Sequence, residues 1–134
     1  MTINAIKAEL ESACYDHDFN RTVIALGIAF LAEETMKDRP EFKELETTIE
    51  VASIWAKAIG HRIESIGKLI TDLMTQSETD GYPDIATATM FVNEVDKLKK
   101  SVKWDSIDPN FYQNADLIYR LMKPYVESSM EGEA

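Results

Sequence analysis

Apolar residues recur along this chain at the spacing of helix faces, and no segment alternates apolar and polar residues as a β-strand does. The first predicted helix, residues 2–15, carries one apolar face made of Ile3, Ile6, Leu10, Ala13 and Cys14. The second begins near Asp18 or Asn20, either of which can cap it, and turns acidic at Glu33 and Glu34. Because its middle is apolar nearly all round, we expect that middle to be buried on every side.

The next segment follows a heptad pattern. Asp38 can cap a helix whose first turn holds Pro40, and Glu41 stands at the return position of a capping box. The a and d positions that follow are all apolar: Phe42, Leu45, Ile49, Ala52, Ala56, Ile59, Ile63, Ile66, Ile70 and Leu73. The pattern predicts one long helix over residues 39–76.

The length of this helix limits how it can be packed. About 36 residues at 1.5 Å per residue span about 54 Å, whereas a globule formed by this chain is roughly 36 Å across. The helix must therefore be covered by a second chain or be kinked, and Gly60 and Gly67 are the candidate kinks. We favour a homodimer, with a seam formed by Ala56, Ile59, Ile63, Ile66 and Ile70.

Two shorter helices and a tail follow. Asp84 can cap a fourth helix, which ends in lysines that suit the negative end of its dipole: Lys97, Lys99, Lys100 and Lys103. The Asp108–Pro109 pair opens a fifth helix, which Lys123–Pro124 should end or bend. Residues 129–134 are acidic and small, and we expect this tail to fray.

The size and composition of the chain fit one folded domain. Its 134 residues, 45% hydrophobic and 28% charged, are enough for a single core and exclude wholesale disorder or a fibrous chain. The predicted fold is therefore all-α. It is a helical bundle of about five helices around the long helix of residues 39–76, in a single domain over residues 1–128.

The charge balance and the single cysteine bear on partners and compartment. With 24 acidic and 14 basic residues, the net charge of -10 repels phosphate backbones and disfavours direct binding of nucleic acid. The longest apolar run, residues 23–32, is about half the length of a membrane span, and the first residues lack the pattern of a secretory signal. Cys14 is interpreted as a small core residue. These features predict a cytoplasmic protein without membrane contact.

No arrangement of residues in the sequence predicts catalysis or a cofactor. Neither His17 nor His61 follows a glutamate by three positions, as the Glu-x-x-His motif of di-iron bundles requires. The Glu33–Glu34 pair lacks the third acid of a magnesium-binding helix, because Lys37 stands in its place. Asp16-His17-Asp18 is interpreted as a turn with a helix cap rather than a metal site. We therefore expect no metal, no cofactor and no enzymatic activity.

Acidic residues gather around the start of the long helix. Six of them are the predicted contacts to a protein partner with a basic surface: Glu33, Glu34, Glu41, Glu44, Glu46 and Glu50. The plainer interpretation is a solvated face that keeps the protein soluble. We favour a non-catalytic acidic protein-binding module, such as an inhibitor, immunity protein, adaptor or assembly chaperone.

Two alternatives stay open. Rows of carboxylates on a rigid helix can imitate a phosphate backbone, which would suit a nucleic-acid-mimicking inhibitor of a DNA- or RNA-binding protein, of the kind a phage or mobile element encodes. A small helical enzyme or ligand-binding bundle, with a site between its helices, is the second alternative.

Overall fold

A computed structural model describes residues 2–133 of the chain, with side chains through residue 130. Within these residues the fold is all-helical and contains no β-strand, as the sequence predicted. The elements are α1 (Ile3–Tyr15), α2 (Phe19–Met36), α3 (Phe42–Asp80), α4 (Ile85–Ser101), the 3-10 helix η1 (Trp104–Ser106) and α5 (Pro109–Glu133). Together they make five α-helices and one short 3-10 helix.

The chain divides into two compact units, which are described separately. The first, unit 1, is Met1–Gly60, and the second, unit 2, is His61–Ala134. The division falls within α3, at one of the two glycines predicted as kinks. The predicted single domain of residues 1–128 spans both units.

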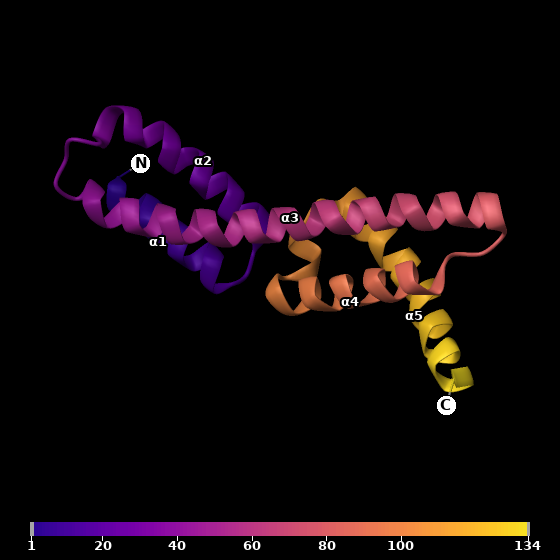
Figure 1. Cartoon of the computed structure of the whole chain (residues 1–134). Coiled ribbons are helices and arrows are strands. Elements are labelled where there is room, and N and C mark those ends of the chain that lie inside the picture. Colours follow the sequence, from indigo (N-terminus) through magenta and orange to yellow (C-terminus); the bar gives the residue numbers. More distant parts are fainter. Residues whose placement is uncertain (1, 134) are drawn as a thin grey trace. The chain divides into compact units, whose positions relative to one another are not determined.

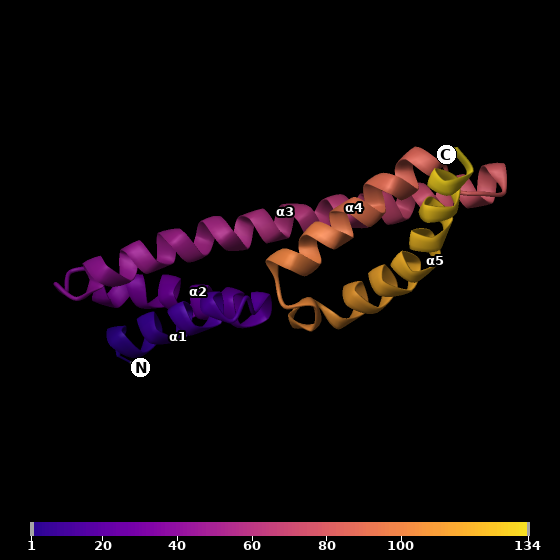
Figure 2. The same cartoon turned by 90° about the horizontal axis from the view of Figure 1, so that it is seen from below.

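In unit 1, α1, α2 and the first part of α3 lie side by side (Figures 1 and 2). Thr2 and Asp18 cap α1 and α2, since their side chains accept hydrogen bonds from the backbone N–H groups of Ala5 and Arg21, each at 3.1 Å. The buried core joins all three helices: Ile3, Ile6, Leu10, Ala25, Leu26, Ala29, Ala32, Phe42, Leu45, Ile49 and Ala52. Burial of these aliphatic and aromatic side chains is the main force that holds the unit together.

The middle of α2 is not buried on every side, and this prediction is wrong. One face contacts the core, while Val23, Ile24, Phe30 and Leu31 on the other face are 46%, 64%, 50% and 71% exposed. The physical reason is that α2 has only α1 and α3 as neighbours within unit 1. Two neighbouring helices on one side leave the opposite face of α2 uncovered.

Helix α3 begins and ends later than predicted. Residues 37–41 form turns, and the N–H of Phe42 donates to the carbonyl of Arg39 at 3.0 Å, so the predicted start at residue 39 with Asp38 as cap is wrong. The helix ends at Asp80, and the next residue, Gly81, takes φ of 85° and donates its N–H to the carbonyl of Ser77 at 3.1 Å. Glycine is favoured there because it has no Cβ to clash in the left-handed region.

Unit 2 contains the second part of α3 together with α4, η1 and α5; Figure 2 shows α4 and α5 joined through η1. Asp84 caps α4 as predicted, by accepting from the N–H of Thr87 at 3.1 Å. Gln76 of α3 holds the same turn, because its side chain accepts from the N–H of Asp84 at 2.8 Å and donates to the Thr87 hydroxyl at 3.1 Å. The most deeply buried apolar side chains of the unit are Ile66, Ala88, Phe91, Val95, Leu98, Ile107 and Ala115.

Helix α5 does not end at the Lys123–Pro124 pair, which was predicted to end or bend it. Pro124 lies inside the helix, and the backbone stays helical through Glu133. Residues 129–133 of the predicted tail therefore belong to α5, and its last residue, Ala134, lies outside the described residues.

Candidate functional site

A groove of about 270 Å³ runs between α1 and α3 of unit 1. Its lining residues are Leu10, Glu11, Cys14, Thr47, Thr48, Val51 and Ala52. Leu10 and Ala52 are fully buried core residues, so the groove opens directly onto the hydrophobic core. Val51 is 62% exposed. A hollow of this kind can accept one apolar side chain of a partner.

Local helix geometry explains why the groove is apolar. Leu10 and Cys14 are four residues apart on α1, and Thr48 and Ala52 are four apart on α3, so each pair lies on one helix face. The hydroxyl of Thr48 donates to the carbonyl of Glu44 at 3.3 Å, and Thr47 bonds to its own helix in the same way. Because these hydroxyls are already satisfied by the helix backbone, the groove favours apolar groups.

Two carboxylates lie close to the groove. Glu11 lines it, and Glu44 precedes its α3 residues by one turn. Lys7 bridges the two helices, with its Nζ 3.6 Å from Glu11 and 3.5 Å from Glu44. One lysine thus lies between two carboxylates, which leaves the rim with net negative charge.

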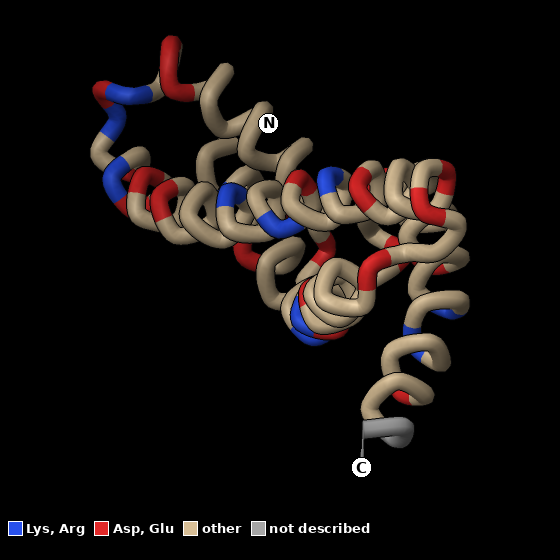
Figure 3. The backbone as a smooth tube through the Cα atoms, turned by 45° about the vertical axis from the view of Figure 1, so that its right-hand side comes forward, with Lys and Arg blue, Asp and Glu red and all other residues tan. Residues whose placement is uncertain are grey.

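All six acidic residues predicted as partner contacts lie in unit 1 and are exposed. Among the described residues, Glu44 is the one of the six that forms an ion pair, and it remains largely open to solvent. Glu33 and Glu34 belong to the last turns of α2, Glu41 to the following turn, and the other three to the start of α3. Figure 3 shows charged residues of both signs along the turn between α2 and α3. The structure brings this acidic group to the same unit as the groove.

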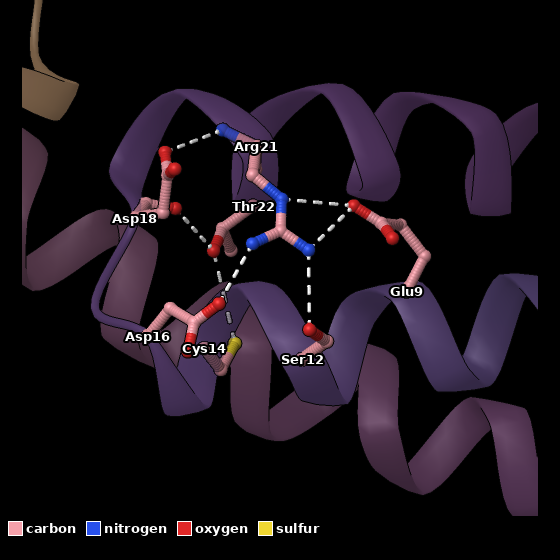
Figure 4. Close-up of polar contacts among 7 residues, drawn as sticks. All are labelled: Glu9, Ser12, Cys14, Asp16, Asp18, Arg21 and Thr22. Atoms are coloured by element: carbon pink, nitrogen blue, oxygen red, sulfur yellow. Dashed lines mark hydrogen bonds and ion pairs between the residues drawn. The ribbon is translucent and has the colours of Figure 1, made fainter.

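A polar network centred on Arg21 ties α1 to α2 (Figure 4). Its guanidinium donates to Asp16 at 2.8 Å, to Glu9 at 3.1 Å and to the hydroxyl of Ser12 at 3.1 Å. These hydrogen bonds, to Asp16 first and then to Glu9, raise the pKa of Arg21 above its ordinary value. Arg21 is paired with two carboxylates, and the position of the network at the connection between two helices indicates a structural role.

The Asp16-His17-Asp18 segment is the predicted turn with a cap. His17 has φ of 54°, Asp18 caps α2, and the His17 ring packs edge-on against Trp55 at 6.2 Å. Cys14 is half-buried, with its Sγ 3.9 Å from the hydroxyl of Thr22. The part of the chain that the structure describes contains no group of three or more His, Cys, Asp or Glu side chains placed to hold a metal ion.

The predicted dimer seam on α3 is partly covered by the chain itself. Ile59 and Ile66 are 3% and 0% exposed, while Ala56, Ile63 and Ile70 are half-buried. Ile59 and Ile66 are thus covered within the single chain, whereas the other three residues keep part of their surface open, and the seam stays a prediction.

Unit 2 contains a polar and aromatic cluster that the sequence analysis did not anticipate. The hydroxyl of Tyr119 on α5 donates to Asp96 of α4 at 2.5 Å and accepts from Lys123 at 3.1 Å. Lys99 was predicted to interact with the negative end of the helix dipole. Its Nζ lies 4.0 Å from the centre of the Tyr119 ring and 5.4 Å from that of the Trp104 ring. The local signals are the short spacings of Tyr119 and Lys123 and of Lys99 and Trp104; the contacts of Tyr119 with Asp96 and Lys99 join residues far apart in sequence.

Comparison with protein-family models, with curated proteins and with solved structures gave no match to this chain. Within the described residues, no helix is both long enough and apolar enough to cross a membrane.

Proposed function

We propose that this chain is a non-catalytic binding module that captures a basic segment of another protein on unit 1. The observation that carries the proposal is the apolar groove between α1 and α3, which lies among exposed carboxylates. An apolar side chain of the partner enters the groove, and the partner's lysines or arginines face Glu11, Glu44 and Glu50. The single free thiol, Cys14, fits a cytoplasmic setting.

The groove and the carboxylates near it contribute to binding in different ways. Burying an apolar anchor in the groove supplies most of the affinity, because desolvated central contacts dominate binding energies. The carboxylates increase the rate of encounter and select partners by charge. Exposed ion pairs add little net free energy.

The apolar groove also favours this function over the nucleic-acid mimic. A mimic of a phosphate backbone needs carboxylates at regular spacing and gains nothing from a hydrophobic hollow. Here Val51, which is 62% exposed, and one carboxylate, Glu11, line the same hollow. A partner that loses affinity when Val51 alone is changed therefore supports the protein-binding proposal.

The test uses a defined probe. A fluorescent leucine–lysine amphipathic helix of about 20 residues is titrated with the full chain, and its anisotropy is compared with that of the leucine–glutamate counterpart. We expect the basic peptide to bind and the acidic one not to bind. Backbone amide shifts in a two-dimensional NMR spectrum should change around Leu10, Thr48 and Val51.

Matched variants separate the groove from general charge attraction. Val51→Gln should weaken binding by about tenfold, whereas Ile54→Gln, equally exposed but outside the groove, should leave it unchanged. Neutralising Glu44, Glu46 and Glu50 with glutamine should weaken binding more than neutralising three carboxylates of unit 2: Glu64, Glu78 and Glu127. Equal effects of the two triple variants, or NMR changes confined to unit 2, would refute the proposal.

A further inference from the structure

The exposed face of α2 has the pattern of a helix that packs on another helix. Five residues follow one another at intervals of four and three: Asn20, Ile24, Gly27, Leu31 and Glu34. Val23 and Phe30 extend the apolar part of this stripe on one side. These seven residues, here called the α2 outer face, have an apolar centre and polar ends, and the four-and-three spacing of the first five is that of a coiled-coil seam.

The α2 outer face is complementary to itself when two copies of the helix run in opposite directions. Gly27 then lies at the two-fold axis, Val23 meets the partner's Phe30, and Ile24 meets the partner's Leu31. At each end Asn20 lies opposite the partner's Glu34, so an amide donor faces a carboxylate acceptor. A parallel pair would instead place the two Glu34 carboxylates together, which is unfavourable.

Gly27 occupies the position where such helices cross. A Cβ placed on Gly27 would have no atom within 4 Å in the single chain. A glycine in a helix interior lowers stability by about 0.5–1 kcal/mol relative to alanine, and no contact within the unit requires it here. A second helix backbone lying against this point would favour a residue without a Cβ, because its absence lets two helices approach most closely.

The exposed apolar area is large enough for a dimer. At 46–71% exposure, the four side chains offer on the order of 400 Å² per copy when their whole exposed surface is covered, and Phe30, the one aromatic ring, has the largest full area. A standard non-obligate interface covers roughly 600–1,000 Å² per partner, about 57% of it apolar, which requires roughly 350–550 Å² of apolar surface. The α2 outer face meets the lower end of this range.

We therefore propose that two copies of the chain associate through antiparallel packing of their α2 outer faces, with Gly27 at the two-fold axis. The proposal uses no residue of the groove between α1 and α3. Since each copy carries a net charge of -10, added salt should strengthen the dimer by screening repulsion.

Sedimentation equilibrium of the full chain, over about 1 µM to about 1 mM, tests the proposal. We expect the mass to rise with concentration from 15.2 kDa towards twice that value. Gly27→Gln should raise the dimer Kd at least about tenfold without lowering the thermal stability of the monomer, because glutamine favours helix over glycine. Gly27→Ala adds only a methyl group and serves as the milder variant should Gln perturb folding.

The direction of packing is tested by charge. Asn20→Lys places a lysine opposite the partner's Glu34 and should lower the dimer Kd several-fold; adding Glu34→Lys should reverse the gain. Asn93→Lys, an exposed site on α4, gives the same change in net charge away from the face. A monomer at every concentration, a dimer insensitive to Gly27→Gln, or equal effects of Asn20→Lys and Asn93→Lys would each overturn the proposal.

Discussion

Replacing Tyr119 by phenylalanine removes one hydroxyl that joins α4 to α5. The hydroxyl donates to Asp96 at 2.5 Å and accepts from Lys123 at 3.1 Å. The tyrosine is only 7% exposed, and phenylalanine keeps its ring. Tyr119→Phe therefore removes hydrogen bonds without opening a cavity.

The expected loss follows from the charge of the acceptor. A hydrogen bond to a charged group contributes about 1.5–3 kcal/mol to stability, and a neutral one about 0.5–1.5 kcal/mol. We expect Tyr119→Phe to lower the free energy of unfolding by about 1.5–3 kcal/mol at neutral pH. Asp96→Asn keeps an acceptor for the hydroxyl, so its effect should be smaller.

The same contact predicts a dependence on alkaline pH. Burial, followed by the hydrogen bond to Asp96, raises the pKa of Tyr119 above its ordinary value, while Lys123 acts in the opposite direction. A raised pKa in the folded state means that the stabilisation is fully present below the unfolded pKa, about 10, and is lost as pH rises through the folded value. The pKa of Lys123 is also raised, chiefly by its hydrogen bond to Tyr119, and contributes in the same direction. The difference in the free energy of unfolding between the wild type and Tyr119→Phe should therefore become smaller at alkaline pH.

Urea unfolding followed by tryptophan fluorescence measures this effect. The chain has two tryptophans, so a Trp55→Phe background leaves Trp104 as the reporter of unit 2. Tyr82→Phe is the matched control, because Tyr82 is 63% exposed, and it should change stability by no more than about 0.5 kcal/mol. The reasoning would be refuted if Tyr119→Phe changed the free energy of unfolding at neutral pH as little as Tyr82→Phe does. It would also be refuted if the difference in this free energy between the wild type and Tyr119→Phe widened as pH rises.

Three further substitutions have expected outcomes. Gly81→Ala should destabilise unit 2 by about 1–2 kcal/mol, because Gly81 has φ of 85°; urea unfolding with Trp104 as reporter measures the loss. Gly67→Ala should instead stabilise by about 0.5–1 kcal/mol, since its Cβ would meet no atom within 4 Å; a loss would contradict the open geometry at Gly67. Asp18→Ala should destabilise unit 1 by about 0.5–2 kcal/mol through loss of the cap on α2. Its readout is the change in unfolding midpoint with Trp55 as reporter, and an unchanged midpoint would show that the cap contributes nothing.

The presence of the helices could be predicted because apolar periodicity is a local property of the sequence. The capping residues could be predicted for the same reason. Asp18 and Asp84 each bond to a backbone N–H three residues ahead, so their signal lies within one turn of sequence. Asp38 and Pro40 gave an equally strong local signal that failed. Aspartate and proline two residues apart are also typical of turns, and the Asp38-Arg39-Pro40 segment forms turns that end where Phe42 enters the core.

Neither the groove nor the exposed face of α2 could be predicted from the sequence. The groove depends on Leu10 and Val51 being brought together from separate helices, and periodicity does not specify which helix faces meet. Apolar residues occur on nearly all faces of α2, and we interpreted this as full burial. The pattern shows only how apolar the helix is. How many neighbours cover a helix is a property of the tertiary structure.

Salt dependence distinguishes the two proposed uses of unit 1 because their charges combine in opposite ways. A basic segment on the acidic groove brings unlike charges together, so its affinity should fall as salt rises. Two copies meeting through α2 bring like net charges together at an apolar contact, so their association should strengthen under the same change. The opposite dependence in either case would show that the surface assigned to that association is wrong, since screening acts on the sign of the charges that meet.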